Sequence, residues 1–219
     1  MKRTVLGAAL LLVLSYNSGA FANTILFERL TTTSPVIPYG QLYADVLDAS
    51  TPGDPAVEFL FHNNVGLACS VVEIYVDDGA GLLASLYNVL EGGDVSFSAG
   101  NSSPAHLPGG NNAFPPFDGI PALGAEADAG PGGKVNHGID ESTDFVGLFY
   151  SLEPGKQFSD VTSALADGEL RFGLHMQSIA GGSSDSYIDP PGVPEPATLL
   201  LVGTGLFGWL GWACRRRMN

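Results

Sequence analysis

Two acidic clusters in this sequence carry the side chains best suited to hold a hard cation. Asp77 and Asp78 precede Gly79, and Asp140 and Asp144 bound a second acidic stretch. Carboxylate oxygens placed in loops are the ligands that Ca²⁺ prefers. Neither spacing matches the EF-hand loop, so calcium binding and plain solvated loops both stay open as interpretations. No other cofactor is expected.

Motifs of catalysis are missing from the chain. It has no Gly-x-Ser-x-Gly elbow, no His-Glu-x-x-His, no phosphate-binding loop and no dinucleotide fingerprint after a strand. Its histidines are spaced widely and are expected at turns or on the surface: His62, His106, His137 and His175. His175 shares the polar side of its predicted strand with Arg171 and Gln177, which favours solvent exposure. We therefore predict that the protein is not an enzyme.

The many carboxylates of the chain keep a glycoside hydrolase open as a functional alternative, ranked third after the two non-enzymatic roles given at the end of this section. Such an enzyme needs only two carboxylates about 5–9.5 Å apart. With 23 acidic residues, one pair will reach that spacing by chance. Both tryptophans, the usual sugar-stacking residues, lie near the C-terminus at positions 209 and 212.

Cysteine provides no second route to catalysis. Cys69 lies in an apolar run and is predicted to be a small buried hydrophobe. A nucleophilic thiol needs an electropositive setting, which so acidic a chain does not offer. Cys214 belongs to the C-terminal segment, beyond a predicted membrane span, so the two cannot form a disulfide.

Charge excludes nucleic acid as a partner. The chain has 9 basic and 23 acidic residues. Five of the basic residues lie in the terminal segments described below, so residues 23–196 retain four of them with all the acidic residues, a net charge of −19. Binding to phosphate backbones requires a basic surface. So acidic a domain is instead soluble and repels its neighbours.

The N-terminus has the three parts of a secretory signal peptide. Lys2 and Arg3 precede an apolar run at 5–14, and Ala20-Phe21-Ala22 forms a small-x-small cleavage site. We predict cleavage after Ala22 by signal peptidase, following transport by the export machinery. Residues 1–22 are therefore a targeting segment.

The C-terminus combines a short motif, an apolar span and a basic cluster. Pro194-Glu195-Pro196 precedes seventeen uncharged residues at 197–213, and Arg215, Arg216 and Arg217 follow. Seventeen helical residues span roughly 26 Å, just short of a hydrocarbon core. Arginines stay on the cytoplasmic side, which orients the predicted transmembrane helix with its C-terminus inside.

This arrangement at 193–217 resembles the PEP-CTERM sorting signal of exported bacterial proteins. The resemblance implies that exosortase, a membrane transpeptidase-like enzyme, recognises Pro194-Glu195-Pro196 and removes the tail. It also implies a Gram-negative host that makes exopolysaccharide. A plain C-terminal membrane anchor is the alternative. Residues 189–192, Asp-Pro-Pro-Gly, are predicted to be a stiff spacer before the motif.

In the middle of the chain, apolar and polar residues alternate as they do in half-buried antiparallel strands. Val72, Ile74 and Val76 share one face of a predicted half-buried strand, and a similar pattern repeats at 169–177. Asp77-Asp78-Gly79 is typical of a hairpin turn. The predicted strands cover 24–30, 40–47, 57–62, 69–76, 82–90, 95–98, 145–152, 169–179 and a short segment near Tyr187.

Two segments depart from the strand pattern. Residues 99–138 are rich in Gly and Pro but contain apolar side chains such as Phe114 and Phe117, which predicts a long ordered excursion across the sheets. Residues 159–166 are the helix candidate, with Ser159 or Asp160 as N-cap and Gly168 just past the end.

These observations predict a mainly β protein, an antiparallel β-sandwich ectodomain at 23–188 with one short helix, flanked by a signal peptide and a transmembrane helix. We expect an exported, exosortase-processed surface or extracellular-matrix protein, transiently anchored by its C-terminal helix. Its expected role is structural or adhesive, in an exopolysaccharide-rich envelope or biofilm. The alternative is a carbohydrate-binding module that grips the exopolysaccharide, and an exposed row of aromatic side chains on one sheet face would favour it.

Overall fold

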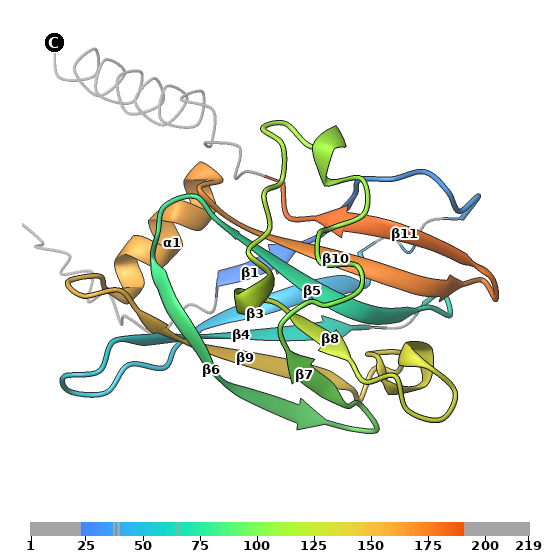
Figure 1. The fold of residues 1–219 in the computed structure, drawn as a ribbon, viewed down its shortest axis with the longest axis horizontal. Helices are drawn as coiled ribbons and strands as arrows, with labels where there is room; N and C mark the ends of the chain where they lie inside the picture. The colour runs from blue at the N-terminus through green and yellow to red at the C-terminus, as the bar shows by residue number, and fades with distance from the viewer. Residues whose placement is uncertain (1–22, 37, 39, 65, 191–219) are drawn as a thin grey trace, which may run out of the picture.

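The structure is a computed structural model that describes residues 23–36, 38, 40–64 and 66–190, and these form two stacked antiparallel sheets (Figure 1). Sheet A has the strand order β1-β3-β4-β9-β6, and sheet B has the order β2-β11-β10-β5-β8-β7. This confirms the predicted mainly β class with one helix. The predicted signal peptide and C-terminal transmembrane helix lie outside the described residues.

The elements, in chain order, are β1 (Asn23–Leu26), β2 (Glu28–Arg29), β3 (Leu42–Asp48), β4 (Ala56–Asn63), β5 (Ser70–Asp78), β6 (Leu83–Gly92), β7 (Phe97–Ala99), η1 (Gly110–Asn112), η2 (Pro121–Leu123), β8 (Ala125–Ala127), η3 (Lys134–His137), β9 (Phe145–Leu152), α1 (Phe158–Asp167), β10 (Leu170–Ile179) and β11 (Ser183–Ile188).

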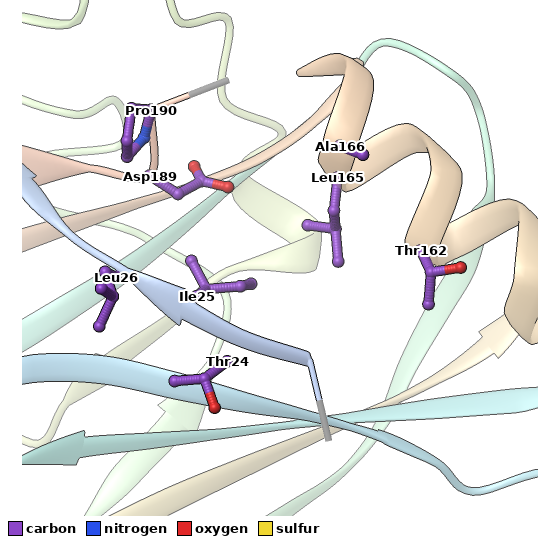
Figure 2. A pocket seen from close by; sticks show the side chains of 8 residues that line it. All are labelled: Thr24, Ile25, Leu26, Thr162, Leu165, Ala166, Asp189 and Pro190. Atoms are coloured by element: carbon purple, nitrogen blue, oxygen red, sulfur yellow. The ribbon is translucent and has the colours of Figure 1, made fainter. Parts of the chain in front are cut away.

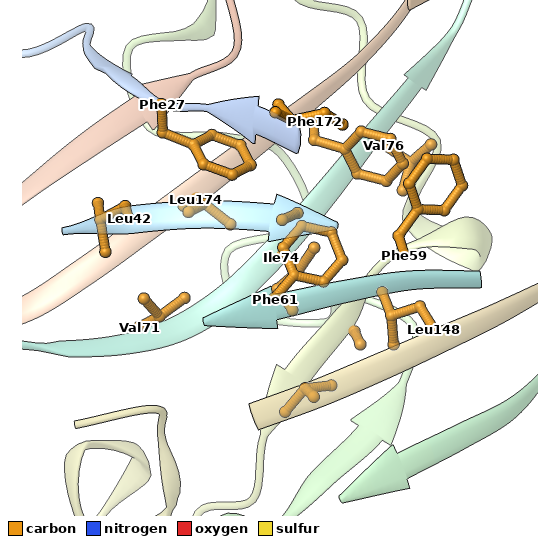
Figure 3. Close-up of a cluster of buried hydrophobic side chains, with 14 of the residues drawn as sticks. Phe27, Leu42, Phe59, Phe61, Val71, Ile74, Val76, Leu148, Phe172 and Leu174 are labelled. Atoms are coloured by element: carbon orange, nitrogen blue, oxygen red, sulfur yellow. The ribbon is translucent and has the colours of Figure 1, made fainter. Parts of the chain in front are cut away.

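Aromatic side chains fill the space between the sheets (Figure 3). Phe59 and Phe61 project from β4, and Phe172 projects from β10 to meet them, with ring centroids 4.4 Å and 5.5 Å apart. All three are at most 1% exposed. The alternation of apolar residues along each strand builds this core, because successive side chains of a strand point to opposite faces.

Two predictions about strand connections are wrong. The strand predicted at 24–30 is divided between β1 in sheet A and β2 in sheet B, with the buried Phe27 at the crossing. Asp77-Asp78-Gly79 does not close a hairpin, since β5 belongs to sheet B and β6 to sheet A. The chain crosses between the layers there, and the Asp78 carboxylate stabilises the crossing by accepting the backbone N–H groups of Leu82 and Leu83 at 2.8 Å.

The half-burial predicted for β5 and β10 is also wrong, because the excursion at 99–138 covers the outer face of sheet B. In Figure 1 its green segment passes across β5 and β10. Leu107 and Phe117 pack there on Tyr75 of β5 as a second, smaller core. Gly173 of β10 permits this contact, since a Cβ atom at that position would lie 2.7 Å from Leu107 Cδ2. The predicted ordered excursion is thereby confirmed.

Helix α1 begins one residue before its predicted start. Gln157 is the N-cap, and the Asp160 carboxylate accepts its backbone N–H at 2.8 Å, so Asp160 lies at the third helical position instead of capping. The helix ends at Asp167, one residue beyond its predicted end. Gly168 follows as the C-cap, as predicted, and its φ of 71° is the left-handed conformation that glycine adopts readily.

Candidate functional site

A buried ionic network attaches the excursion to sheet B. Glu73 of β5 is fully buried, and its carboxylate oxygens lie 2.6 Å from Lys134 Nζ and 2.5 Å from His175 Nδ1. Lys134 also lies 2.9 Å from Glu126. His175 is therefore only 8% exposed. The expectation that it faces solvent is wrong, because the excursion covers the polar side of β10.

The network keeps its carboxylates ionised. Burial alone would raise the pKa of Glu73, but hydrogen bonds from His175 and Lys134 hold it below the usual 4.5. The pKa of Glu126 is held at about 2, since hydrogen bonds from Ser102 and Lys134 outweigh burial. Both folded pKa values lie below the unfolded value, so their contribution to stability is present above pH 4.5 and is lost as the pH falls. The network is thus a structural clamp on the excursion.

Asp77, one of the predicted calcium ligands, is part of a second clamp. Its carboxylate forms a salt bridge with Arg171, whose guanidinium also donates to the carbonyl oxygens of Pro115 and Pro116 at 2.7 Å. The same guanidinium lies 5.4 Å from the centroid of the Phe117 ring. Asp77 therefore neutralises a buried arginine, and Asp78 is engaged by backbone N–H groups as described above.

The other two predicted ligands lie together in the loop before β9. Asp144 accepts the backbone N–H groups of Asp140 and Glu141 at 3.3 Å and 3.0 Å. The pKa of Asp140 is raised to about 6, mainly by burial and further by the hydrogen bond with Asp144 and the negative charge of Asp144. Among the described residues, no group of three or more His, Cys, Asp or Glu side chains is placed to hold a metal ion. Calcium binding at either acidic cluster stays a prediction.

Cys69 is buried, as predicted, in a polar pocket of the loop before β5. Its Sγ lies 3.1 Å from Gln41 Nε2 and from the Leu67 carbonyl oxygen. Burial raises the pKa of this thiol to about 11. It therefore stays protonated at neutral pH, and a protonated thiol is a poor nucleophile.

The outer face of sheet A, which we call the open face, carries the half-exposed apolar and aromatic side chains of the sandwich. They alternate along the strands with core residues and comprise Leu26, Tyr43, Leu60, His62, Tyr87, Leu90, Phe145 and Phe149. Leu26, Tyr87 and Leu90 are 61%, 55% and 42% exposed, respectively. Large contiguous apolar patches on protein surfaces are typical of interaction sites.

Strand register arranges these side chains in rows. Leu26, Tyr43, His62 and Phe145 lie opposite one another across β1, β3, β4 and β9. The Tyr43 and His62 rings are stacked with centroids 4.8 Å apart, and the His62 and Phe145 centroids are 6.2 Å apart. Tyr87 of the edge strand β6 lies 6.1 Å from Phe149, centroid to centroid. The open face thus presents two aromatic clusters, one across β3, β4 and β9 and one across β9 and β6.

Sequence reasoning did not single out the open face, although β9 contains a signal for it. Its sequence, FVGLFYSL, places apolar side chains on both faces of the strand. Only the face with Val146, Leu148 and Tyr150 is buried in the core, which leaves Phe145 and Phe149 on the open face. Two aromatic residues at alternate positions, on the side opposite the core, are the pattern that predicts such a surface.

The polypeptide leaves the domain beside a pocket of about 410 Å³ between β1 and α1 (Figure 2). Leu165 of α1 and Ile25 of β1 project into it, and Asp189 closes one end. Asp189, the first residue of the predicted spacer, is 5% exposed, and its carboxylate accepts the backbone N–H of Phe172 at 2.7 Å. The folded domain therefore extends to the residue before Pro190.

Asp189 makes the stability of the domain depend on pH. Burial raises the pKa of its carboxyl to about 7 from 3.8, with nearby Asp77 acting in the same direction and Arg171 opposing it. The folded state then binds a proton that the unfolded state releases, so the contribution of Asp189 to stability is fully present below pH 3.8 and is lost as the pH rises to about 7.

We expect Asp189→Asn to remove this dependence, because an amide oxygen still accepts the Phe172 N–H without an ionisable proton. Thermal unfolding at pH 8 should show a variant about 2–4 kcal/mol more stable than the wild type, and the difference should shrink towards pH 4. Asp54→Asn, at an exposed turn, is the matched control. It should change neither the stability at pH 8 nor the dependence of stability on pH. An Asp189→Asn variant that is less stable at pH 8 would contradict this assignment.

Comparison with known proteins identifies the segment that follows Pro190. Residues 192–217 match the PEP-CTERM protein-sorting motif. The chain therefore carries a PEP-CTERM sorting domain, and this motif supports an exported protein that exosortase processes, with a surface or extracellular location. No curated protein and no solved structure matches the chain.

The motif residues Pro194, Glu195 and Pro196, the arginines at 215–217 and the predicted cleavage site at Ala20 and Ala22 lie outside the described residues. In the part of the chain that the structure describes, no helix is long and apolar enough to cross a membrane.

Proposed function

We propose that the protein is an adhesive component of an exopolysaccharide-rich envelope or biofilm, which binds polysaccharide through the open face. The arrangement of the two outer faces carries this proposal. The excursion covers sheet B, whereas sheet A exposes its aromatic rows. A surface protein that contributed bulk alone would have no need of an uncovered apolar face.

The chemistry of the open face suits a sugar polymer. Pyranose rings have flat faces of C–H groups that stack on aromatic rings, and their hydroxyls hydrogen-bond to neighbouring polar side chains. Tyr87 and Phe149 supply rings, while Ser85 and Ser151 supply hydroxyls at the same edge, with their Oγ atoms 2.8 Å apart. Flat sheet surfaces of this kind accommodate an extended strand of sugars. We propose binding without catalysis.

The acidic surface adds a second role, since it keeps neighbouring copies apart in a crowded matrix. Residues 23–196 have a net charge of −19. At physiological ionic strength such repulsion acts over about 8 Å. The protein would then space polysaccharide strands as well as bind them.

Binding to exopolysaccharide should depend on Tyr87. We expect Tyr87→Ala to weaken retention of the exported protein on exopolysaccharide from its own host about 5–10-fold, because truncating an exposed aromatic anchor removes about 1 kcal/mol or more of contact free energy. Co-sedimentation of protein with purified polysaccharide measures this.

Phe114→Ala is the matched control for Tyr87→Ala. Phe114 is 94% exposed, but it belongs to the excursion that lies over sheet B. Its truncation removes a similar apolar area from the other side of the domain, so binding should be unchanged. Equal losses in the two variants would contradict a role for the open face and would indicate nonspecific adhesion.

A further inference from the structure

Glu58 places an unpaired carboxylate on the open face. It lies in the middle of β4, opposite Leu47 of β3 and Phe149 of β9. Within the part of the chain that the structure describes, its carboxylate has no hydrogen-bond or ion-pair partner, and burial raises its pKa above 4.5. A carboxylate that is partly removed from water without a partner is unfavourable unless a ligand supplies the compensating donor.

The backbone of β9 brings this carboxylate over the centre of the open face. Gly147 lies two residues before Phe149, and a Cβ atom at Gly147 would lie 3.0 Å from Glu58 Oε1, 3.3 Å from Leu90 Cβ and 3.4 Å from Leu60 Cδ1. The glycine therefore lets the Glu58 oxygen approach the sheet between two leucines. The result is a carboxylate flanked by Leu60, Leu90 and Phe149.

No basic side chain of the described domain is placed to neutralise Glu58. Arg29, Lys134 and Arg171 are each paired with buried acids of sheet B or its covering loops. Lys156, the fourth basic residue of the described domain, lies in the loop after β9 and forms no salt bridge with a described residue. Burial lowers the pKa of His62 against the opposing effect of Asp45, so the imidazole is neutral at neutral pH. With Asp45 also on this side of β3, the open face is negative.

Charge complementarity then selects the ligand. A negative surface disfavours polyanionic glycans and favours ammonium groups. Aromatic rings beside a carboxylate bind ammonium groups by cation–π contact in addition to charge. Phe149 lies directly opposite Glu58 across β4 and β9, and Tyr87 packs against Phe149.

We propose that Glu58, with Phe149 and Tyr87, forms a subsite for a sugar that bears a free amine, within a glycan strand bound along the open face. This inference rests on the proposed function and specifies its ligand, an amino-sugar polymer that is not fully N-acetylated. The carboxylate accepts a hydrogen bond from the ammonium group, and the rings stack on the sugar.

The test uses the exported protein with two soluble probes, oligomers of β-1,4-linked glucosamine and the same oligomers fully N-acetylated. We expect the wild type to bind the free-amine oligomer at least tenfold more tightly. Glu58→Gln, which keeps the shape but removes the charge, should lower affinity for the free-amine oligomer about 10–100-fold, as for loss of a charge-assisted hydrogen bond. Its affinity for the N-acetylated oligomer should be unchanged. Glu153→Gln, at an exposed position outside the open face, is the control.

Three results would overturn the proposal, and they separate it from the proposed function. If host exopolysaccharide is bound in a Tyr87-dependent way while both oligomers bind equally and Glu58→Gln has no effect, the function holds and the amine subsite is wrong. If neither exopolysaccharide nor oligomer is bound, the proposed function fails as well. If a lysine-rich peptide binds in a Glu58-dependent way and the glucosamine oligomer does not, the partner of the open face is a protein.

Discussion

Replacing Glu195 by Ala is expected to leave the protein uncut and held in the inner membrane. Glu195 is the charged residue of the Pro-Glu-Pro motif, which lies within the matched sorting segment at 192–217. The substitution does not alter the uncharged span at 197–213, so insertion should be intact while recognition by exosortase is lost. We expect removal of the tail to fall at least tenfold, measured by fractionation and immunoblotting with an epitope tag in the excursion.

Two further variants separate recognition from retention. Replacing Arg215, Arg216 and Arg217 together should weaken the stop signal and the orientation of the helix, so that some chains pass through the membrane. Glu153→Ala makes the same chemical change as Glu195→Ala in an exposed loop and should be processed normally. A Glu195→Ala protein that loses its tail at the wild-type rate would show that the motif is not the recognition element. A plain anchor or nonspecific proteolysis would then explain the tail.

Lys134→Met is expected to have the largest effect on stability. The substitution leaves Glu73 fully buried without its cation, and Glu126 loses the same partner. Breaking a buried ion pair by removing one member destabilises proteins by about 3–5 kcal/mol. For a domain of this size the midpoint of thermal unfolding should fall by roughly 6–20 °C at pH 7. Lys156→Met is the matched control, because Lys156 forms no salt bridge with a described residue.

A double-mutant cycle tests whether the loss arises from the buried charge. Glu73→Gln removes that charge, so the double variant Lys134→Met/Glu73→Gln should be more stable than the sum of the single losses predicts, by about 1–3 kcal/mol. Additive losses would show that the two side chains act independently. The loss in Lys134→Met should also shrink as the pH falls below 4.5, since protonation of Glu73 and Glu126 removes the charges.

Alternation of side chains predicted the core side of the sheets and failed on the other side of sheet B. The inward positions of β10, such as Phe172 and Leu174, follow directly from the period of two and are buried. The outward position of His175 is buried as well, because residues of the excursion cover it. A Gly- and Pro-rich segment has no period that would tell which face it covers, and Lys134 is 61 residues from Glu73 in the sequence.

The connection between the two sheets after β5 could not be predicted from the local sequence either. Asp77-Asp78-Gly79 has the composition of a hairpin turn, and the same residues serve as a crossing when the next strand pairs with β9 in sheet A. Strand pairing is a long-range property, whereas turn composition is a local one. The ion pair of Asp77, a predicted calcium ligand, was hidden for the same reason, since its partner Arg171 is 94 residues away in the sequence.

The identity of the C-terminus in the exported protein shows directly whether the sorting segment at 192–217 is removed. We would purify the protein from the extracellular or surface fraction of its native host and determine its C-terminal residue by mass spectrometry of proteolytic peptides. We predict a chain that has lost the apolar span at 197–213 and the arginines after it, and that retains the folded domain through Asp189. A protein recovered from that fraction with Asn219 as its C-terminus would contradict this prediction.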